Sequence, residues 1–144
     1  MKISTRGRYA LRVMIDLAEH SADAPIPLKD IVARQDISQK YLESIMTDLT
    51  KAGILSAQHG KGGGYKFCRE PEQITVLEIL RTTEGDLAPI ACLDQGAEPC
   101  ARAAECRTLP MWERLYDLIR EYLGGITLAD LTLTDPAGGD NYVI

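Results

Sequence analysis

The sequence predicts a mainly α-helical fold with one small β-hairpin. Apolar residues recur at helical spacing within residues 7–20, 28–34 and 38–52. Two short β-prone runs then flank a glycine-rich segment, and a long amphipathic stretch follows near the C-terminus. These three observations predict a group of short helices, a hairpin, and one long late helix.

The first three helices are predicted from their apolar stripes and their end signals. In the first helix the stripe consists of Ala10, Leu11, Met14, Leu17 and Ala18. A short second helix is expected over 28–34, and Ser38 is placed to cap a third helix that ends at Gly53. Two short helices joined by a turn of about four residues have the spacing of a helix-turn-helix.

The hairpin is expected immediately after the third helix. Residues 54–58 and 65–68 are β-prone, and the tip between them carries glycine at positions 60, 62, 63 and 64. A hairpin in this position is the wing of a winged helix-turn-helix. A phosphate-binding loop is rejected because no helix follows the glycines and no Lys-Ser or Lys-Thr pair is present.

Beyond the wing, Thr75 and Glu78 match a capping box at the start of a short helix that runs to about Arg81. From 82 to 107 periodicity is lost, glycine and proline recur, and three of the four cysteines occur. A stretch of this length without regular structure is expected to be functional or ordered by a metal.

A strong helix is predicted to start at 108–110 and to end at Gly124-Gly125. Its apolar residues are Trp112, Leu115, Ile119 and Tyr122, flanked by Tyr116, Leu118 and Leu123. So wide an apolar face favours dimerisation, with burial inside its own domain as the alternative. Thr127 is expected to cap a last turn, and a polar tail is predicted from Asp135.

The predicted organisation therefore has four parts. Residues 1–83 form a winged helix-turn-helix DNA-binding domain, with the helix-turn-helix at about 28–52 and the wing at about 54–68. Residues 84–107 form a cysteine-bearing sensor loop, called here the cysteine loop. Residues 108–132 form the dimerisation helix and its following turn, and 133–144 form the tail.

Composition and charge agree with a DNA-binding protein outside the membrane. Hydrophobic residues make up 45% and charged residues 26%, as in ordinary globular proteins. No apolar run approaches the roughly 20 residues that cross a bilayer, and no secretory signal is seen, so a cytoplasmic location is expected.

Residues 1–70 hold 11 Lys and Arg against 8 Asp and Glu, whereas residues 71–144 hold 5 against 13. This asymmetry suits a DNA reader joined to an acidic sensing or dimerising half.

Double-stranded DNA is the expected partner, because the major groove accepts one α-helix. The start of the third helix offers Gln39 for an adenine edge, and Glu43 for a cytosine amino group or for restricting which sites are tolerated. The wing tip and the N-terminus offer contacts to phosphates or to the minor groove. The candidate DNA-binding residues are Lys2, Thr5, Arg6, Arg8, Ser38, Gln39, Lys40, Tyr41, Glu43, His59, Lys61 and Gly62.

The four cysteines are predicted to serve metal or redox chemistry rather than structural disulfides. The chain is long enough to build a core without staples. Cys92, Cys100 and Cys106 share the cysteine loop, whereas Cys68 is expected to be a small half-buried residue on the wing strand. No C-x-x-C pair, no Ser/His/Asp set and only two histidines are present, so no enzymatic activity is expected.

Several motifs together carry a family resemblance. Residues 1–10, the run Ile37-Ser38-Gln39-Lys40-Tyr41-Leu42-Glu43, Gly53-Ile54-Leu55, residues 60–65 and residues 126–131 resemble the bacterial Rrf-type winged-helix regulators. This family includes IscR-like, NsrR-like and CymR-like members, and the resemblance spans residues 1 to about 132. It implies a homodimer that binds a palindromic operator through its winged helices.

The resemblance also implies a cofactor, because the cysteine trio lies where cluster-binding members keep theirs. Thiolates are the natural ligands of iron–sulfur clusters, and [2Fe–2S] is favoured over [4Fe–4S]. The fourth ligand is unknown, because the histidine position of IscR-like members is Leu109 here and the aspartate position of NsrR-like members is Arg8. Asp94, Glu98, Glu105, a residue of the partner subunit or a small molecule remain candidates.

Other forms of control stay open. Two loop cysteines could form a disulfide as a redox switch, and zinc is disfavoured because close cysteine pairs are absent. CymR-like members lack the trio. The resemblance to them therefore leaves open a further alternative, in which a partner protein docks on the acidic half and regulates the chain.

Overall fold

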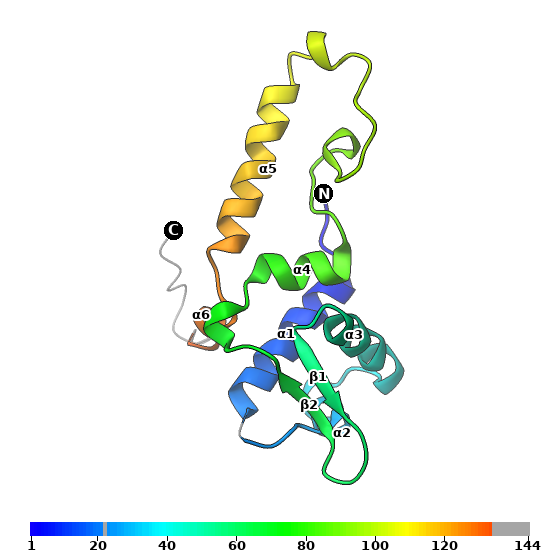
Figure 1. Ribbon diagram of the computed structural model, residues 1–144, viewed down its shortest axis with the longest axis vertical. Coiled ribbons are helices and arrows are strands. Elements are labelled where there is room, and N and C mark those ends of the chain that lie inside the picture. The colour runs from blue at the N-terminus through cyan, green and yellow to red at the C-terminus, as the bar shows by residue number, and fades with distance from the viewer. Residues whose placement is uncertain (22, 134–144) are drawn as a thin grey trace.

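A computed structural model describes residues 1–21 and 23–133, and it confirms a mainly helical fold with one hairpin (Figure 1). The helices are α1 (Thr5–His20), α2 (Leu28–Gln35), α3 (Gln39–Lys51), α4 (Val76–Glu84), α5 (Leu109–Gly124) and α6 (Leu128–Thr132). The strands are β1 (Leu55–Gln58) and β2 (Gly64–Phe67), and three short 3-10 turns are η1 (Pro71–Gln73), η2 (Ala91–Leu93) and η3 (Ala103–Glu105). The 3-10 turns were not predicted. The expected tail, from residue 134 onward, lies outside the described residues.

The helix starts follow local hydrogen-bonding rules. Ser38 caps α3 as predicted, its hydroxyl accepting from the N–H of Tyr41 at 3.3 Å. At α4 the capping box is only half formed: Thr75 accepts from the Glu78 N–H, but the Glu78 carboxylate pairs with Arg69 instead. The complete box, with both reciprocal hydrogen bonds, occurs at α6.

The main core lies where the apolar stripes of the first three helices meet. It is closed by β1, by Ile74 at the end of η1, and by Leu128 of α6. Its fully buried larger side chains are Met14, Leu17, Ile31, Leu42, Ile45, Met46, Leu49, Ile54, Leu55, Ile74, Ile79 and Leu128. Because α1 packs on α2, α4 and α6, it is the central helix of the domain.

One carboxylate lies inside this domain. Asp16 on α1 is 1% exposed, and the Arg34 guanidinium donates to both of its oxygens at 2.7 and 3.0 Å. Gln35 donates to the same carboxylate at 2.7 Å. Burial acts to raise the pKa of Asp16, but the hydrogen bonds from Arg34 and Gln35 and the positive charge of Arg34 outweigh it and hold this pKa below its ordinary value. The carboxylate thereby fixes α2 against α1.

Replacing Asp16 with asparagine is expected to lower the free energy of unfolding at pH 7 by about 2 kcal/mol, because the buried network loses its negative charge and one of its two acceptor oxygens. The pKa in the folded state is lowered, so the stability due to Asp16 is present above the unfolded value of about 3.9 and is lost as pH falls through the folded value. Urea unfolding of wild type and Asp16→Asn across this pH range measures both effects. Asp23→Asn, at an exposed position, is the control. Equal stability of the two variants at pH 7 would contradict the assignment.

The hairpin is held against the domain by a third segment. β1 and β2 pair antiparallel with Leu55 opposite Phe67, and Ile26 bridges to Tyr65 through two backbone hydrogen bonds of 2.9 Å. A Cβ on Gly64 would lie 2.3 Å from the carbonyl oxygen of Ile26, so only glycine permits this approach. The wing is therefore anchored to the segment just before α2.

The remaining elements form a second, smaller cluster. Val76 and Leu80 of α4 and Leu87 pack with Ile119 and Leu123 of α5. From this contact α5 extends away from the domain, so that the cysteine loop and the wing tip lie at opposite ends of the molecule (Figure 1). Among the described helices, none is both long and apolar enough to cross a membrane.

Candidate nucleic-acid interface and cysteine loop

The start of α3 presents a small polar surface. Gln39, Lys40 and Glu43 are exposed, and the Gln39 amide donates to the Glu43 carboxylate at 3.1 Å. Tyr41 is half-buried and packs edge-on against Tyr9, with 5.8 Å between ring centroids. Of the predicted contacts at this site, Gln39, Lys40 and Glu43 are therefore the most accessible. Ser38 is exposed too, but its hydroxyl is already engaged in capping α3.

The wing tip is also open to solvent. His59, Lys61 and Gly62 are exposed, and Gly62 adopts a left-handed φ of 76°. The wing and α3 influence each other electrostatically: burial raises the pKa of Tyr65 on β2, and the negative charge of Glu43 raises it further. The recognition helix and the wing are also neighbours in the fold, because α3 packs against β1.

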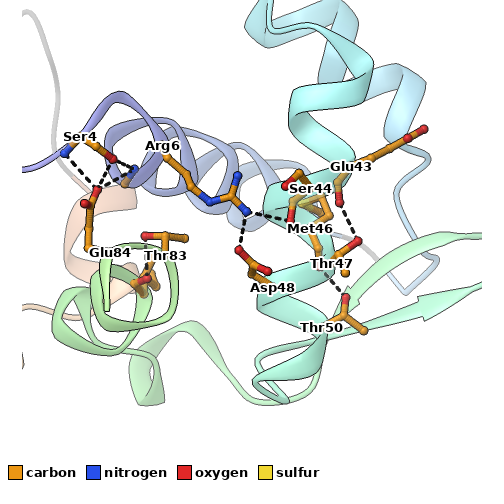
Figure 2. Close-up of polar contacts among 12 residues, drawn as sticks. Ser4, Arg6, Glu43, Ser44, Met46, Thr47, Asp48, Thr50, Thr83 and Glu84 are labelled. Atoms are coloured by element: carbon orange, nitrogen blue, oxygen red, sulfur yellow. Dashed lines mark hydrogen bonds and ion pairs between the residues drawn. The ribbon is translucent and has the colours of Figure 1, made fainter. Parts of the chain in front are cut away.

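The predicted contacts at the N-terminus divide into two kinds. Lys2, Thr5 and Arg8 are exposed, as a contact to phosphate requires. Arg6 instead turns toward α3, where its guanidinium donates to the Ser44 carbonyl at 3.1 Å and pairs with the Asp48 carboxylate (Figure 2). This ion pair was not predicted, because no local pattern relates positions 6 and 48.

The cysteines are not gathered into one site. Cys92 and Cys100 are exposed, Cys106 is half-exposed, and all four cysteines are free thiols. Within residues 1–21 and 23–133, no group of three or more His, Cys, Asp or Glu side chains is placed to hold a metal ion. Cys68 is exposed, so the expectation of a half-buried residue is wrong; β2 ends one residue earlier and leaves its side chain at the surface.

Asp86 organises the first part of the cysteine loop. Its carboxylate accepts from the Tyr116 hydroxyl of α5 at 2.6 Å, from the Ala88 N–H at 3.0 Å, and from the Gln95 N–H. The hydrogen bond from Tyr116, followed by that from Gln95, holds the pKa of Asp86 below its ordinary value. The loop segment that contains Cys92 is thereby attached to α5.

Cys106 occupies a different environment at the start of α5. Its sulfur lies 3.5 Å from the Thr108 hydroxyl oxygen. This contact and the backbone amides of Thr108 and Leu109 lower the pKa of the Cys106 thiol below its ordinary value.

Chemically, the set of three thiols with nearby exposed carboxylates fits a thiophilic iron–sulfur cluster. Geometrically, one chain as described does not assemble the site, so binding requires a rearranged loop or a second chain.

The comparisons with known proteins cover nearly the whole chain. The model of the family described as "Rrf2: Iron-dependent Transcriptional regulator" matches residues 3–134. The HTH-type transcriptional regulator IscR of Xenorhabdus nematophila is 38% identical over 131 residues, which is 91% of this chain and 79% of that protein. The IscR of Aliivibrio salmonicida is 37% identical over 91% of this chain and 77% of its own length.

Solved structures give the same result. The structure of CymR, the global cysteine regulator of B. subtilis, is similar with a TM-score of 0.74 and 38% identity, covering 94% of this chain and 99% of that one. T. potens IscR is similar with a TM-score of 0.72 and 36% identity, covering 99% and 94%. An oxidized form of Staphylococcus aureus CymR has a TM-score of 0.70 and 34% identity, covering 94% and 98%.

Proposed function

The chain belongs to the Rrf2 family of transcriptional regulators, and from this membership we propose that it is a cytoplasmic homodimer that binds a palindromic operator. Its relatives are regulators and not enzymes, which confirms the prediction that it has no catalytic role. The observation that carries the proposal is that α3 packs against β1 of the wing, and that both the start of α3 and the wing tip carry exposed polar groups. In this proposal Gln39, Lys40 and Glu43 face the major groove.

The remaining predicted contacts have supporting roles. His59, Lys61 and Gly62 at the wing tip lie along phosphates or in the minor groove, and the exposed Lys2, Thr5 and Arg8 reach phosphates. Glu43 restricts which sequences are accepted, because its carboxylate repels phosphate and acceptor groups of unsuitable sites. The hydrogen bond to Glu43 also preorganises the Gln39 amide in the free protein.

We further propose that Cys92, Cys100 and Cys106 hold an iron–sulfur cluster, with [2Fe–2S] favoured and the fourth ligand unassigned. The donor chemistry supports this, together with the iron-dependent description of the family and the IscR names of the relatives. When bound, such a cluster supplies a redox-active centre that is sensitive to oxidants. The protein's part is to offer three thiolates on one loop whose two ends are attached to α4 and α5.

The alternative is the same DNA-binding regulator controlled without a cluster, by thiol oxidation or by a partner protein. Two observations support this cluster-free form of control. The thiols are free and dispersed in the described chain, and the similar structures include CymR proteins, one of them in an oxidized form. Under this alternative the purified protein is colourless, because it holds no cluster, and it still binds its operator.

The DNA-binding proposal is tested with duplexes selected by the wild-type protein from a random library. Lys61→Ala is expected to weaken binding to all duplexes alike and to reduce the slope of log affinity against log salt by about 1, because one phosphate contact is lost. Gln39→Ala is expected to cost about 1–3 kcal/mol on the selected duplex and to relax the preference at one base position.

Lys51→Ala serves as the matched control, because Lys51 is an exposed lysine at the far end of α3. Its affinity and salt slope are expected to equal those of wild type. Enrichment of no sequence by the wild-type protein would contradict the proposed function. A Gln39→Ala variant with unchanged sequence preference would remove Gln39 from the interface.

A further inference from the structure

Glu84, the last residue of α4, places its carboxylate at the N-terminus of α1 (Figure 2). One oxygen accepts three hydrogen bonds: from the Ser4 N–H at 3.0 Å, from the Ser4 hydroxyl at 2.5 Å and from the Gly7 N–H at 3.0 Å. The first N–H groups of a helix have no partners within the helix, and a negative charge there is favoured by the helix dipole. Glu84 therefore caps α1 from a position 80 residues away in the chain.

The glycine at position 7 is what permits this contact. Gly7 is buried, and a Cβ built on it would lie 2.2 Å from the Glu84 carboxylate oxygen. Glycine is otherwise unfavourable in a helix by about 1 kcal/mol relative to alanine. The fold thus accepts a weaker helix former in the first turn of α1 in exchange for the approach of Glu84.

The same turn of α1 also holds the recognition helix. Arg6, adjacent to Gly7, contacts the Ser44 carbonyl and the Asp48 carboxylate of α3 through one nitrogen of its guanidinium. The Arg6 side chain is only 24% exposed, so this ion pair is partly shielded from solvent. A single helical turn therefore connects the end of α4 on one side to α3 on the other.

The end of α4 is in turn the point where the cysteine loop begins. Two residues after Glu84, Asp86 binds the Tyr116 hydroxyl and the Gln95 amide of the loop. Any rearrangement of the loop that displaces residues 84–86 consequently acts on the Glu84 contacts. The connection therefore runs from the loop along the chain at residues 84–86 to Glu84, and from there through the first turn of α1 and Arg6 to α3.

We propose that Glu84 and Arg6 are positioning residues that couple the start of the cysteine loop to the recognition helix α3. This inference rests on the proposed DNA-binding function, and it assigns Arg6 to the contact with α3 rather than to a phosphate. Neither residue reads a base. Their effect is on how well the α3 surface fits its preferred sequence, and so on the ratio of affinities for the selected duplex and a scrambled duplex of the same length.

The test uses the full chain and those two duplexes. Glu84→Ala removes the Glu84 contacts and leaves the Ser4 hydroxyl, which also accepts from the Gly7 N–H at 3.4 Å. Gly7→Ala pushes the carboxylate away while leaving its charge in place. Both are expected to lower the affinity ratio roughly threefold to tenfold with an unchanged salt slope. Glu84→Gln, whose amide oxygen can still accept hydrogen bonds, is expected to lie between Glu84→Ala and wild type. Glu72→Ala, at an exposed position on η1, is the control and should leave the ratio unchanged.

Coupling is measured with the double variant Glu84→Ala/Asp48→Asn. If the two sites act through one connection, the double variant loses less than the product of the two single losses. Thermal unfolding confirms that each variant is folded, and Gly7→Ala keeps the test decisive if Glu84→Ala is unstable.

Three outcomes would overturn this inference alone, and a fourth would overturn it together with the proposed function. Independent, multiplicative losses would show that Glu84 and Asp48 are not coupled, and an unchanged ratio in Gly7→Ala would show that the cap does not matter. An Arg6→Gln variant with a salt slope reduced by about 1 and an unchanged ratio would show that Arg6 contacts phosphate. A wild-type protein that prefers no duplex would overturn the proposed function, and this inference with it, whereas the other three leave that function intact.

Discussion

Replacing Leu118 with glutamate is expected to convert a dimer into monomers and to weaken binding to a palindromic duplex by roughly 100-fold or more. The loss is large because two half-sites bound by one dimer reinforce each other, and this gain disappears when the protomers separate. Leu118 lies at the middle of α5, and its side chain is 45% exposed in the single chain.

Dissociation of the dimer is expected because the apolar residues of α5 lie on two sides of the helix. Ile119 and Leu123 pack against α4, which satisfies one side of the helix. A second stripe at spacings of four, three and four residues remains exposed, and it consists of Met111, Leu115, Leu118 and Tyr122. Such a contiguous stripe on an extended helix is the kind of surface that a second copy of the chain covers. A charge at its centre would have to be buried without a partner.

Sedimentation equilibrium measures the oligomeric state, and titration of the selected duplex measures affinity. Gln73→Glu, which adds the same charge at an exposed position on η1, is the control and should remain dimeric. An L118E protein that stays dimeric with full affinity would place the dimer interface elsewhere. A monomeric wild-type protein would remove the homodimer from the proposed function.

The sequence was sufficient for elements whose residues repeat. The stripes of α1 and α3, the Ser38 cap and the hairpin all follow from local periodicity or from single-residue preferences, and the structure has them where they were expected. For α5 one wide apolar face was predicted, whereas the structure divides it between a side that packs on α4 and an exposed side. Met111 was missed as a member of the exposed stripe. Its position before Trp112 fits no pattern until the packing of α5 on α4 is known.

The contacts that were missed join residues far apart in the chain. Arg6 was assigned to DNA because it is an arginine near a helix start, and nothing in its neighbourhood signals Asp48. Glu84 was expected at the start of the cysteine loop, because the helix before it was predicted to end at about Arg81, and nothing near Glu84 in the chain signals Ser4 or Gly7. The cysteine loop shows no period because its order comes from single contacts such as Asp86 with Tyr116.

The second large effect is expected when one of the proposed cluster ligands is replaced. Wild-type protein purified without oxygen is expected to show broad visible absorption with stoichiometric iron and sulfide, and Cys92→Ala is expected to lose nearly all of it. A cluster needs its thiolates, and removal of one of the three proposed for this chain leaves too few to retain the inorganic core. The same variant should bind the selected duplex as the cluster-free protein does.

The exposure of Cys92 allows the absorption of wild type and Cys92→Ala to be compared without a large change in stability. Cys92 is exposed, so Cys92→Ala is expected to change stability by no more than about 0.5 kcal/mol. Cys68→Ala changes an equally exposed thiol outside the cysteine loop and should keep the colour. Colour retained in Cys92→Ala would exclude Cys92 as a ligand. A colourless wild type after attempted reconstitution would instead transfer control to thiol oxidation or a partner protein, and it would leave the DNA-binding proposal intact, because α3 and the wing contain none of the three loop cysteines.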